Sequence, residues 1–452
     1  MNKPFPFVVK GKCVDISYEG YGVFKNDEIT AFVTGMYPGD EGEVEIEYKR
    51  NGCFFGRIKK LDIFSEDRIA PLCKICTSCG GCQFQPYKYE KELEFKTNLV
   101  KEQFKKIAHI DVDVNPTIGM ENNLHYRNKI QMPIGWNMYK NKAIYGFYRQ
   151  GTHRIIENTD CNIEDSRAKN ILDTIVGAMN ELSIPPYDEK DGSGIIRHAL
   201  IRTSRRYKQV MLVVVTTRFN FPAKKAFFDK IRENCTDITT IVLNINDKKT
   251  NVVLGEKEEI IFGSGKIKDT LCGLEFEISS RSFFQTNPVM TEVLYNKAME
   301  VASIENDDVV MDAYSGIGTI GLIAAKKAKR VIAVENVEEA VKDAKKNAAK
   351  NNATNYECFR EDATSFIKKY QGNVDVLFMD PPRKGSTLEF LEASMKLMPK
   401  KIVYVSCNPS TLARDVSVLL RKYALCSVSP IDMFPRTNHC ETVVSLVFKT
   451  PK

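Results

Sequence analysis

One cysteine near the end of the chain has the surroundings of a covalent nucleophile. Cys407 ends an apolar run, in the segment Ser406-Cys407-Asn408-Pro409, and precedes a helix predicted to begin at Ser410 or Thr411. The field at a helix N-terminus and the basic pair at 383–384 both favour the thiolate form of such a residue. A cysteine chosen at random is more often a small buried apolar residue. The place of this one at the end of a predicted strand favours a reactive thiol.

A carboxylate further along the chain is a candidate general base for the same centre. Glu441 ends a polar loop that begins at Asp432, and it precedes a predicted strand at 442–448. A carboxylate in that position can take a proton from a bound substrate. A surface carboxylate with no chemical role fits the spacing equally well, so the sequence leaves both interpretations open.

Residues that could bind a cofactor follow several predicted strands in the C-terminal third of the chain. Because the carboxyl ends of parallel strands meet at one edge of a sheet, we expect these side chains to share a crevice. Their convergence indicates function more strongly than any single motif does. The residues are Asp312, Tyr314, Glu335, Asp362, Asp380 and Cys407.

A glycine-rich turn accompanies these residues. The segment Gly316-Ile-Gly318-Thr-Ile-Gly321 has the pattern G-x-G-x-x-G between a predicted strand and a helix, and Glu335 ends the next strand, where it could accept a ribose hydroxyl. This pattern alone fits a nicotinamide cofactor as well as S-adenosylmethionine. Asp312 favours S-adenosylmethionine. This cofactor has no pyrophosphate that must bind at the helix N-terminus, and an acidic residue can instead bind its methionine ammonium.

A proline pair follows the last acidic strand end. In Asp380-Pro381-Pro382-Arg383-Lys384-Gly385 the prolines stop the strand and fix the backbone where a planar base could be held. An ordinary strand-ending turn is the simpler interpretation. The position after this strand order favours a functional loop.

A short loop is dense in cysteine. Cys73, Cys76, Cys79 and Cys82 have the spacing C-x2-C-x2-C-x2-C, and Cys161 lies much later in the chain. Four thiolates within ten residues can hold zinc or an iron–sulfur cluster, and the spacing is close to that of bacterial ferredoxins.

Basic and aromatic residues alternate between Glu121 and Glu157, a stretch that contains no acidic residue. Phosphate contacts and base stacking need this mixture, so we expect RNA to bind here, although each aromatic residue taken singly is more often sheet packing. The basic residues are Arg127, Lys129, Lys140, Lys142, Arg149 and Arg154. The aromatic residues are Tyr126, Trp136, Tyr139, Tyr145, Phe147 and Tyr148. A second basic run supplies Arg197, Arg202, Arg205, Arg206 and Lys208.

The elements that must position these residues fall into three predicted domains. Residues 1–62 alternate short strand-like runs with turn signals, which predicts an OB-like β-barrel. Residues 63–280 have a mixed pattern, which predicts a central α+β domain containing the cysteine loop and an amphipathic helix at 86–108 with a solvated charged face. Residues 281–452 alternate strands and helices, which predicts a doubly wound α/β domain with a parallel sheet.

The totals agree with a multidomain globular protein. The 452 residues are 43% hydrophobic and 27% charged, and the formal net charge of +7 is a modest basic excess that tolerates nucleic acid as a partner. No apolar run is long enough to span a membrane, and the start lacks the pattern of a secretory signal, so we expect a cytoplasmic protein. In that compartment the thirteen cysteines favour metal, cluster or catalytic roles over disulfides.

Taken together, these motifs resemble the RNA (uracil-5-)-methyltransferases, and the resemblance runs through the whole chain. Its most specific parts are Phe283-Phe284-Gln285-Thr-Asn287, Asp312–Gly318, Asp380–Gly385, Ser406–Pro409 with Leu412-Ala-Arg414-Asp415, and Pro435–Glu441. The resemblance implies a Rossmann-like methyltransferase domain, an N-terminal TRAM barrel, and S-adenosylmethionine as the methyl donor. It implies RNA as the substrate, with 23S ribosomal RNA expected and transfer RNA as the alternative.

The resemblance also assigns roles to single residues. It implies that Gln285, Tyr314, Glu335 and Asp380 contact S-adenosylmethionine, as we expect of Asp312, Gly316 and Asp362, that Cys407 adds to C6 of uracil, and that Glu441 removes the proton from C5. Tyr314 stands where family members often have Phe, a change that should preserve stacking. Phe283 would fill or stack against the space that the target uridine leaves, although an ordinary core position is nearly as good an explanation. Arg127 and Lys129 are the expected RNA contacts.

The family pattern for a [4Fe–4S] cluster falls on Cys73, Cys79, Cys82 and Cys161. Cys76 is then an extra thiol, which is the main departure from that pattern. A local site that uses Cys76 and releases Cys161, or a zinc ion in place of the cluster, stays open.

Rival functions fit the sequence less well. Cytosine-5 methyltransferases usually carry a cysteine where this chain has Asp380-Pro381-Pro382, and amino-directed methyltransferases need neither Cys407 nor Glu441. A radical methylthiotransferase needs C-x3-C-x2-C, which does not occur in the sequence. A non-catalytic RNA-binding assembly factor remains an alternative. We expect no membrane association and no obligate protein partner.

Overall fold

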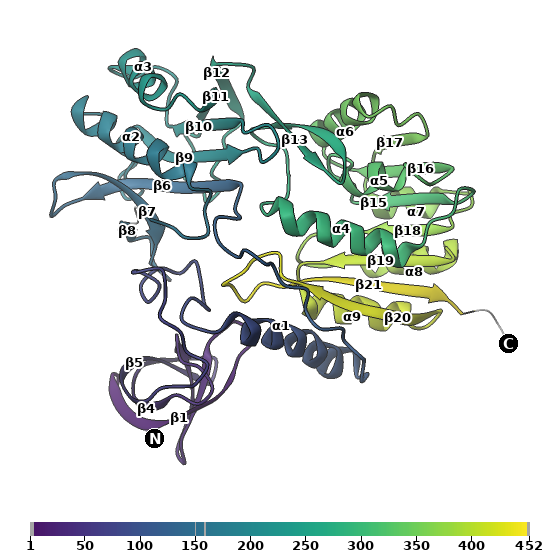
Figure 1. Cartoon of the computed structure of the whole chain (residues 1–452), viewed down its shortest axis with the longest axis horizontal. Coiled ribbons are helices and arrows are strands. Elements are labelled where there is room, and N and C mark those ends of the chain that lie inside the picture. Colours follow the sequence, from purple (N-terminus) through teal and green to yellow (C-terminus); the bar gives the residue numbers. More distant parts are fainter. Residues whose placement is uncertain (1–3, 150, 158–159, 450–452) are drawn as a thin grey trace.

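The computed structural model describes residues 4–149, 151–157 and 160–449. Residues 1–3 of the predicted domain 1–62, residues 150 and 158–159 of the predicted domain 63–280, and residues 450–452 of the predicted domain 281–452 lie outside the described residues. The described chain forms an N-terminal barrel, a central sheet and a C-terminal sheet covered by helices (Figure 1). The barrel lies below the other two parts in that view. The exact domain limits stay predictions.

The N-terminal strands close into a five-stranded barrel, which confirms the expected OB-like module. The burial of β4 alternates, with Gly42, Val44 and Ile46 facing the barrel interior, and the turn at Asn51-Gly52 has the positive φ angles that a tight hairpin needs. The strands, in the order β1-β2-β3-β5-β4, are β1 (Phe7–Ile16), β2 (Gly22–Lys25), β3 (Thr30–Thr34), β4 (Glu41–Arg50) and β5 (Cys53–Ile63).

The helix that follows the cysteine loop packs on the C-terminal domain. Helix α1 (Tyr89–Gln103) continues into a π-helical turn at Phe104–Ala108, and both contact α9 (Pro409–Leu419). Val100 and Phe104 belong to the same apolar cluster as Leu412 of α9. The chain therefore packs against the C-terminal domain at α1, before it forms the strands of the central sheet.

The central domain is a seven-stranded mixed sheet. Two helices, α2 (Arg167–Glu181) and α3 (Lys224–Asn234), bury their apolar faces against one side of it. On the other side, Met211 and Val213 join a cluster that continues into the C-terminal domain. The strands, in the order β12-β11-β10-β9-β6-β7-β8, are β6 (Lys129–Asn137), β7 (Lys142–Tyr148), β8 (Ile155–Glu157), β9 (Ile196–Thr203), β10 (Val210–Thr216), β11 (Ile238–Ile245) and β12 (Lys257–Phe262).

The C-terminal domain has the predicted doubly wound architecture, preceded by the hairpin β13 (Lys266–Leu271) and β14 (Leu274–Ser279). Its sheet has the order β17-β16-β15-β18-β19-β21-β20, and β21 runs antiparallel to both neighbours. The strands are β15 (Val309–Ala313), β16 (Arg330–Glu335), β17 (Tyr356–Arg360), β18 (Val376–Met379), β19 (Lys401–Ser406), β20 (Tyr423–Ile431) and β21 (Glu441–Phe448).

Helices cover both faces of this sheet, as predicted. One apolar cluster joins the sheet to α4 (Pro288–Ala302), α5 (Thr319–Ala324) and α6 (Glu338–Lys350). A second cluster joins it to α7 (Ala363–Lys369), α8 (Leu388–Leu397) and α9. The strand order reverses between β15 and β18, and ligands of such sheets bind at the carboxyl ends of the strands beside this reversal.

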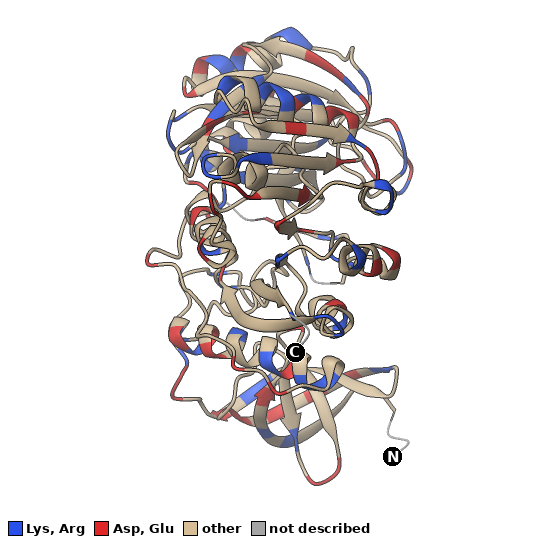
Figure 2. Ribbon diagram, turned by 90° about the vertical axis from the view of Figure 1, so that its right-hand side faces the viewer, with Lys and Arg blue, Asp and Glu red and all other residues tan. Residues whose placement is uncertain are grey.

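No helix among the described residues is long and apolar enough to cross a membrane. Acidic and basic segments are interspersed over the ribbon, so the modest positive charge is not gathered into one domain (Figure 2).

Candidate active site

The strand-end residues line one cavity of about 660 Å³ at the carboxyl edge of the C-terminal sheet. This confirms the expected convergence, because residues at the carboxyl ends of five parallel strands, at the start of β21 and in the segments before β6 and α4 face the same space. The predicted residues that line it are Arg127, Phe283, Gln285, Asp312, Tyr314, Gly316, Glu335, Asp362, Asp380, Cys407 and Glu441.

The glycine turn after β15 is held in shape by the acid that ends β16. Tyr314, Gly316 and Gly318 all have positive φ angles, and a Cβ on Gly318 would lie 2.6 Å from the Tyr356 hydroxyl, so only glycine fits there. Glu335 Oε2 accepts a hydrogen bond of 3.0 Å from the amide of Gly316. Glu335 thus fixes the turn while it faces the cavity.

Asp312 is a buried carboxylate that lacks part of its hydrogen bonding. Its Oδ2 accepts a bond of 2.8 Å from the amide of Gly321, but its Oδ1 has no hydrogen-bond partner among the described residues. Burial raises the pKa of Asp312 to about 8, and the charges of Asp380 and Glu335 add to this effect. A ligand cation at Oδ1 would satisfy this group.

The loop after β18 is fixed by α9. Asp380 is half-buried at the start of this loop, and burial raises its pKa to about 7. The carbonyl of Arg383 accepts from Asn408 Nδ2 at 3.1 Å and from Thr411 Oγ1 at 3.2 Å. Two hydrogen bonds therefore tie this loop to the start of α9.

Asn408 begins that helix. Its Oδ1 accepts from the amide of Ser410 at 3.0 Å, which makes Asn408 the N-cap of α9. The predicted start at Ser410 or Thr411 is wrong, because Pro409 occupies the first helical turn, where its missing amide hydrogen has no cost.

Cys407 and Glu441 lie at the ends of paired strands. Ser406 of β19 pairs with Thr442 of β21, so the residues next to them emerge side by side at the cavity. Burial raises the pKa of Glu441 to about 8, with Asp380 adding to the shift and Arg383 opposing it. Glu441 is buried in the site and is not the surface carboxylate of the alternative interpretation.

The expectation of a Cys407 thiolate is wrong for the ligand-free protein. Burial raises the pKa of this thiol to about 11, and the carboxylates of Glu441 and Asp380 raise it further against the opposing charge of Arg383. The helix N-terminus and Arg383, which lower the pKa of this thiol, do not outweigh burial, Glu441 and Asp380, which raise it. The ligand-free protein therefore holds Cys407 as a thiol near neutral pH.

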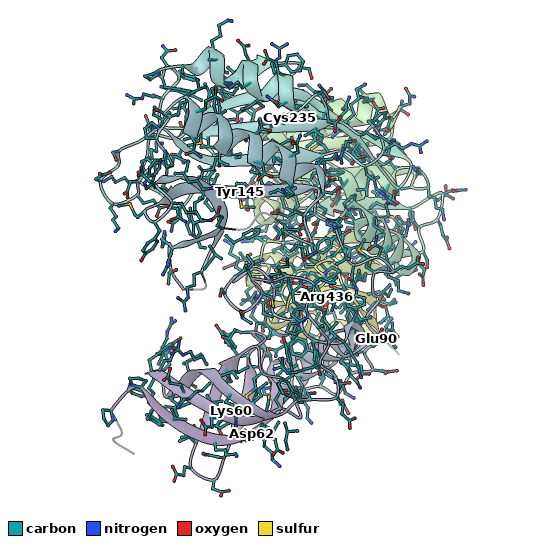
Figure 3. All side chains as sticks on the ribbon, turned by 60° about the vertical axis from the view of Figure 1, so that its left-hand side comes forward. Lys60, Asp62, Glu90, Tyr145, Cys235 and Arg436 are labelled. Carbon is teal, nitrogen blue, oxygen red and sulfur yellow. The ribbon has the colours of Figure 1, made fainter. Side chains whose placement is uncertain are left out.

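The loop that leads to Glu441 is held by a buried ionic cluster that the sequence did not reveal. Lys96 Nζ contacts Glu92 Oε1 at 2.7 Å and Asp432 Oδ1 at 2.6 Å, and all three side chains are completely buried. Glu92 Oε1 also accepts from the amide of Arg436, which lies at the centre of the molecule in Figure 3. The predicted solvated charge face of the helix at 86–108 is therefore wrong at Glu92 and Lys96.

Two further predicted residues differ in their surroundings. Phe283 is exposed by 68% at the cavity rim, so it is not an ordinary core residue. Asp362 caps α7 through a 3.0 Å bond from the amide of Ser365 to its Oδ1, and it also lines the cavity.

The cysteine residues of the loop and Cys161 lie in one region. All thirteen cysteines are free thiols. Burial raises the pKa of Cys82 to about 12, and Cys79 and Cys73 raise it further. The pKa of Cys161 is raised by burial, by Glu164 and by Cys82, so the distant cysteine does reach the loop.

Hydrogen-bond donors face two of these sulfur atoms. The amide of Gly81 donates to Cys79 Sγ at 3.4 Å, and Gln85 Nε2 donates to Cys82 Sγ at 3.6 Å. Among the described residues, no group of three Cys, His, Asp or Glu side chains is placed to hold a metal ion. Cluster-bound thiolates accept hydrogen bonds of this kind, but the described cysteine side chains do not converge on a metal site in this structure. The cluster stays a prediction.

The expected RNA surface is only partly exposed. Trp136 and Tyr139, in the β6–β7 hairpin, are exposed by 45% and 94%, whereas Tyr126 and Tyr145 are buried. Lys129 is half-buried in β6, where burial and the charges of nearby arginines lower its pKa to about 8.

Two arginines of the second basic run are structural. Arg197 Nη1 donates to the carbonyl of Asn246 at 2.8 Å, and Arg202 Nη2 donates to that of Ser282 at 2.5 Å. Both arginines are buried, so their expected part in RNA binding is wrong. Arg205, Arg206 and Lys208 are exposed.

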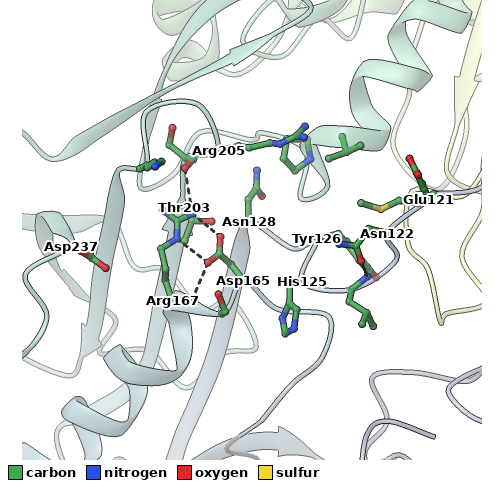
Figure 4. Close-up of a pocket in the computed structure, with 17 residues that line it drawn as sticks. Glu121, Asn122, His125, Tyr126, Asn128, Asp165, Arg167, Thr203, Arg205 and Asp237 are labelled. Atoms are coloured by element: carbon green, nitrogen blue, oxygen red, sulfur yellow. Dashed lines mark hydrogen bonds and ion pairs between the residues drawn. The ribbon is translucent and has the colours of Figure 1, made fainter. Parts of the chain in front are cut away.

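A second cavity of about 690 Å³ lies between the central sheet and α4 (Figure 4). Asp165 and Arg167 form an ion pair of 2.7 Å in its wall, and His125, Asn128 and Arg205 also line it. The described residues of its lining include no cysteine and no strand-end acid of the C-terminal sheet. The residue types for methyl-transfer chemistry gather in the first cavity.

Known proteins resemble this chain over nearly its whole length. The model of the tRNA (uracil-5-)-methyltransferase family matches residues 223–449. An uncharacterized RNA methyltransferase of Oceanobacillus iheyensis is 43% identical over 96% of this chain and 95% of its own, and one of Clostridium tetani is 41% identical over 95% and 94%. The chain belongs to the RNA (uracil-5-)-methyltransferase family.

A solved structure of the same kind matches the whole fold. The tRNA (uracil-54, C5)-methyltransferase of Pyrococcus abyssi, in complex with S-adenosyl-L-homocysteine, has a TM-score of 0.79 at 27% identity, covering 97% of this chain and 99% of its own. The predicted architecture, a methyltransferase α/β domain with an N-terminal OB-like barrel, is thus the one observed.

Proposed function

We propose that this enzyme transfers a methyl group from S-adenosylmethionine to C5 of uridine in RNA through a covalent bond between Cys407 and C6. The observation that carries the proposal is the shared cavity of Cys407 and Glu441, which emerge from paired strands beside the glycine turn and the strand-end acids. A nucleophile and a base that act on neighbouring atoms of one substrate ring must lie this close together.

The cavity fits S-adenosylmethionine by the chemistry of its donors. Bound there, this cofactor supplies an electrophilic methyl group. The free Oδ1 of Asp312 suits the methionine ammonium, and Tyr314 presents a ring for stacking near the strand end. Glu335 and Asp380 offer carboxylate acceptors for the nucleoside part, and Gln285 closes the cavity from the segment before α4.

The two catalytic residues divide the work on the uracil ring. The thiol of Cys407 releases its proton to solvent, and the sulfur forms a bond to C6 while the electrons of the C5–C6 double bond move onto the C4 oxygen as an enolate. This enolate makes C5 nucleophilic, and when C5 takes the methyl group the donor leaves as S-adenosylhomocysteine. Glu441 then takes the proton from C5, and the electron pair of that C–H bond restores the C5–C6 double bond as the bond to Cys407 breaks. Because a uridine must leave its stack to reach Cys407, the exposed ring of Phe283 is placed to fill the vacated space.

The cysteine loop is part of the proposal. We place a [4Fe–4S] cluster on Cys73, Cys79, Cys82 and Cys161, supported by the electrostatic coupling between these thiols and by the donors to two of their sulfur atoms. Free thiols throughout the chain fit the reducing cytoplasm, where we expect the enzyme to work.

The identity of the RNA substrate is the most specific part of the proposal. We keep 23S ribosomal RNA as the expected substrate, which the family resemblance implies. Transfer RNA is the second candidate, favoured by the likeness to the Pyrococcus abyssi enzyme and by the name of the matching family.

One experiment tests the reaction. Purified enzyme receives S-adenosylmethionine with a tritiated methyl group, together with either ribosomal or transfer RNA from cells that lack the enzyme, and the RNA is digested to nucleosides. We expect label in 5-methyluridine from one RNA class, a loss of at least a thousandfold with Cys407→Ala, and a trapped protein–RNA adduct with Glu441→Gln. Label in another nucleoside, or full activity of Cys407→Ala, would overturn the proposal.

A further inference from the structure

The barrel reaches the catalytic loops through one short turn. The segment 17–21 joins β1 to β2, and the Tyr18 hydroxyl donates a hydrogen bond of 3.0 Å to Asn408 Oδ1. In the opposite direction, Asn438 Nδ2 donates to the carbonyl of Tyr18 at 3.3 Å. One of these partners is the neighbour of Cys407, and the other lies three residues before Glu441. The turn therefore touches both loops that carry the catalytic residues.

This turn is fixed before it meets those loops. The amide of Gly20 donates to the Ser17 carbonyl at 2.9 Å, and the amide of Tyr21 donates to Ser17 Oγ at 3.1 Å. Gly20 has a φ of +83°, and a Cβ there would lie 3.2 Å from the Cβ of Asn438. The turn is thus a rigid projection that fits closely against the loop before Glu441.

Asn408 is the point where the contact takes effect. Its Oδ1 also caps α9, and its Nδ2 donates to the carbonyl of Arg383. The hydroxyl of Tyr18 therefore acts on the side chain that fixes the loop after β18, the start of α9 and the backbone that presents Cys407. The Tyr18 side chain is 38% exposed, so this bond is not a by-product of burial in the barrel core.

We propose that Tyr18 is a positioning residue for the nucleophile, and that the 17–21 turn of the barrel is part of the rim of the active site. Through Asn408, Tyr18 keeps the Cys407 sulfur turned into the cavity beside Glu441. This inference rests on the proposed function only for the role of Cys407 in catalysis. The contact itself makes the barrel a structural part of the methyl-transfer centre.

The test removes the Tyr18 hydroxyl and measures Cys407 directly. Tyr18→Phe deletes one oxygen from a half-exposed ring, so folding is retained, and Tyr48→Phe, on the exposed barrel surface, is the matched control. We expect Tyr18→Phe to lower kcat about three- to tenfold with an unchanged KM for S-adenosylmethionine. In enzyme without RNA, alkylation of Cys407 by iodoacetamide should become several-fold faster and its pH midpoint should fall, because the thiol turns toward solvent. The buried Cys440 should stay protected in both variants.

A double-mutant cycle separates positioning from general destabilisation. In the Asn408→Ala background, Tyr18→Phe should have no further effect on the alkylation rate, because the two groups act through one bond. Gly20→Val, whose side chain would strike Asn438, should reproduce the faster alkylation. Additive effects in the cycle, an unchanged alkylation profile of Tyr18→Phe, or exposure of Cys440 would each overturn the inference. If the wild-type enzyme forms no 5-methyluridine while the alkylation results hold, the proposed function fails and the positioning contact stands.

Discussion

At the scale of single residues, the site is organised around buried acids that hold their protons. Asp312, Asp380 and Glu441 all have raised pKa values, with burial as the first cause. A cationic cofactor reverses this balance, because a positive charge favours the ionised carboxylates. The ligand-free cavity is therefore electrostatically prepared for a cation.

The raised pKa of Asp312 makes the stability of the ligand-free enzyme depend on pH. The unfolded carboxyl group has its ordinary pKa of 3.8, whereas burial raises the pKa of the folded one to about 8. The stabilising effect of that proton is thus lost as the pH rises through this window. We expect Asp312→Asn to gain stability relative to wild type between pH 5 and pH 8, by on the order of 2 kcal/mol in urea denaturation.

Asp375 supplies a control of opposite sign for this measurement. Burial opposes its ionisation, but the amide of Val309 and the ammonium of Lys400 outweigh burial and lower its pKa. Asp375→Asn should therefore be less stable than wild type, with a difference that grows as the pH rises to about 4 and stays constant above it. Parallel pH curves for wild type and Asp312→Asn would contradict the assignment of a protonated Asp312.

At the scale of elements, strand ends were predictable and side-chain environments were not. The apolar runs at 309–313 and 401–406 have the length and flanks of buried parallel strands, so the sequence located the cavity edge and eleven of its lining residues. β20 was missed, because its sequence Tyr-Ala-Leu-Cys-Ser-Val-Ser-Pro-Ile lacks a clear alternation and includes a proline. The antiparallel direction of β21, which brings Glu441 to the cavity, depends on that strand.

Charged residues on helices show the limit of pattern reasoning most clearly. Glu92 and Lys96 have the i, i+4 spacing of an exposed ion pair, and nothing in the local sequence shows that a loop 336 residues away covers them. The same limit applies to Arg202, whose acceptors are backbone carbonyls of a distant segment. Long-range burial decides these cases.

Disruption of the buried ionic cluster of α1 should strongly lower the free energy of unfolding. Lys96→Met leaves the carboxylates of Glu92 and Asp432 buried together without a cation, and we expect the free energy of unfolding to fall by about 3–5 kcal/mol in urea. Lys91→Met, which removes an exposed partner of Glu94 on the same helix, should leave stability unchanged within error. A loss for Lys96→Met no larger than that of the control would show that the two acids are neutralised in another way.

At the scale of the whole molecule, three parts of the chain meet around one cavity. The segment before β6 contributes Arg127 to its lining, the C-terminal domain contributes Cys407 and Glu441, and the turn at 17–21 of the barrel contacts Asn408 beside it. We expect RNA that reaches this cavity to contact the exposed tip of the β6–β7 hairpin as well.

The hairpin tip tests that expectation. Tyr139 is 94% exposed, so Tyr139→Ala should leave the melting temperature unchanged and weaken RNA binding by about tenfold through lost stacking. Lys142→Ala, on the neighbouring strand β7, should instead reduce the slope of log Kd against log salt concentration by about 1. RNA binding of Tyr139→Ala with unchanged affinity would remove the hairpin tip from the RNA path.

The contact between the barrel and the catalytic loops also has a consequence for synthesis on the ribosome. The hydrogen bond between Tyr18 and Asn438 spans 420 residues. At about 5–20 residues per second, the finished barrel waits about 20–80 s before its docking partner has been made. During that interval the nascent chain carries a barrel whose turn at 17–21 has no docking partner. The contact between the barrel and the loop before Glu441 therefore forms only after residue 438 has been synthesised.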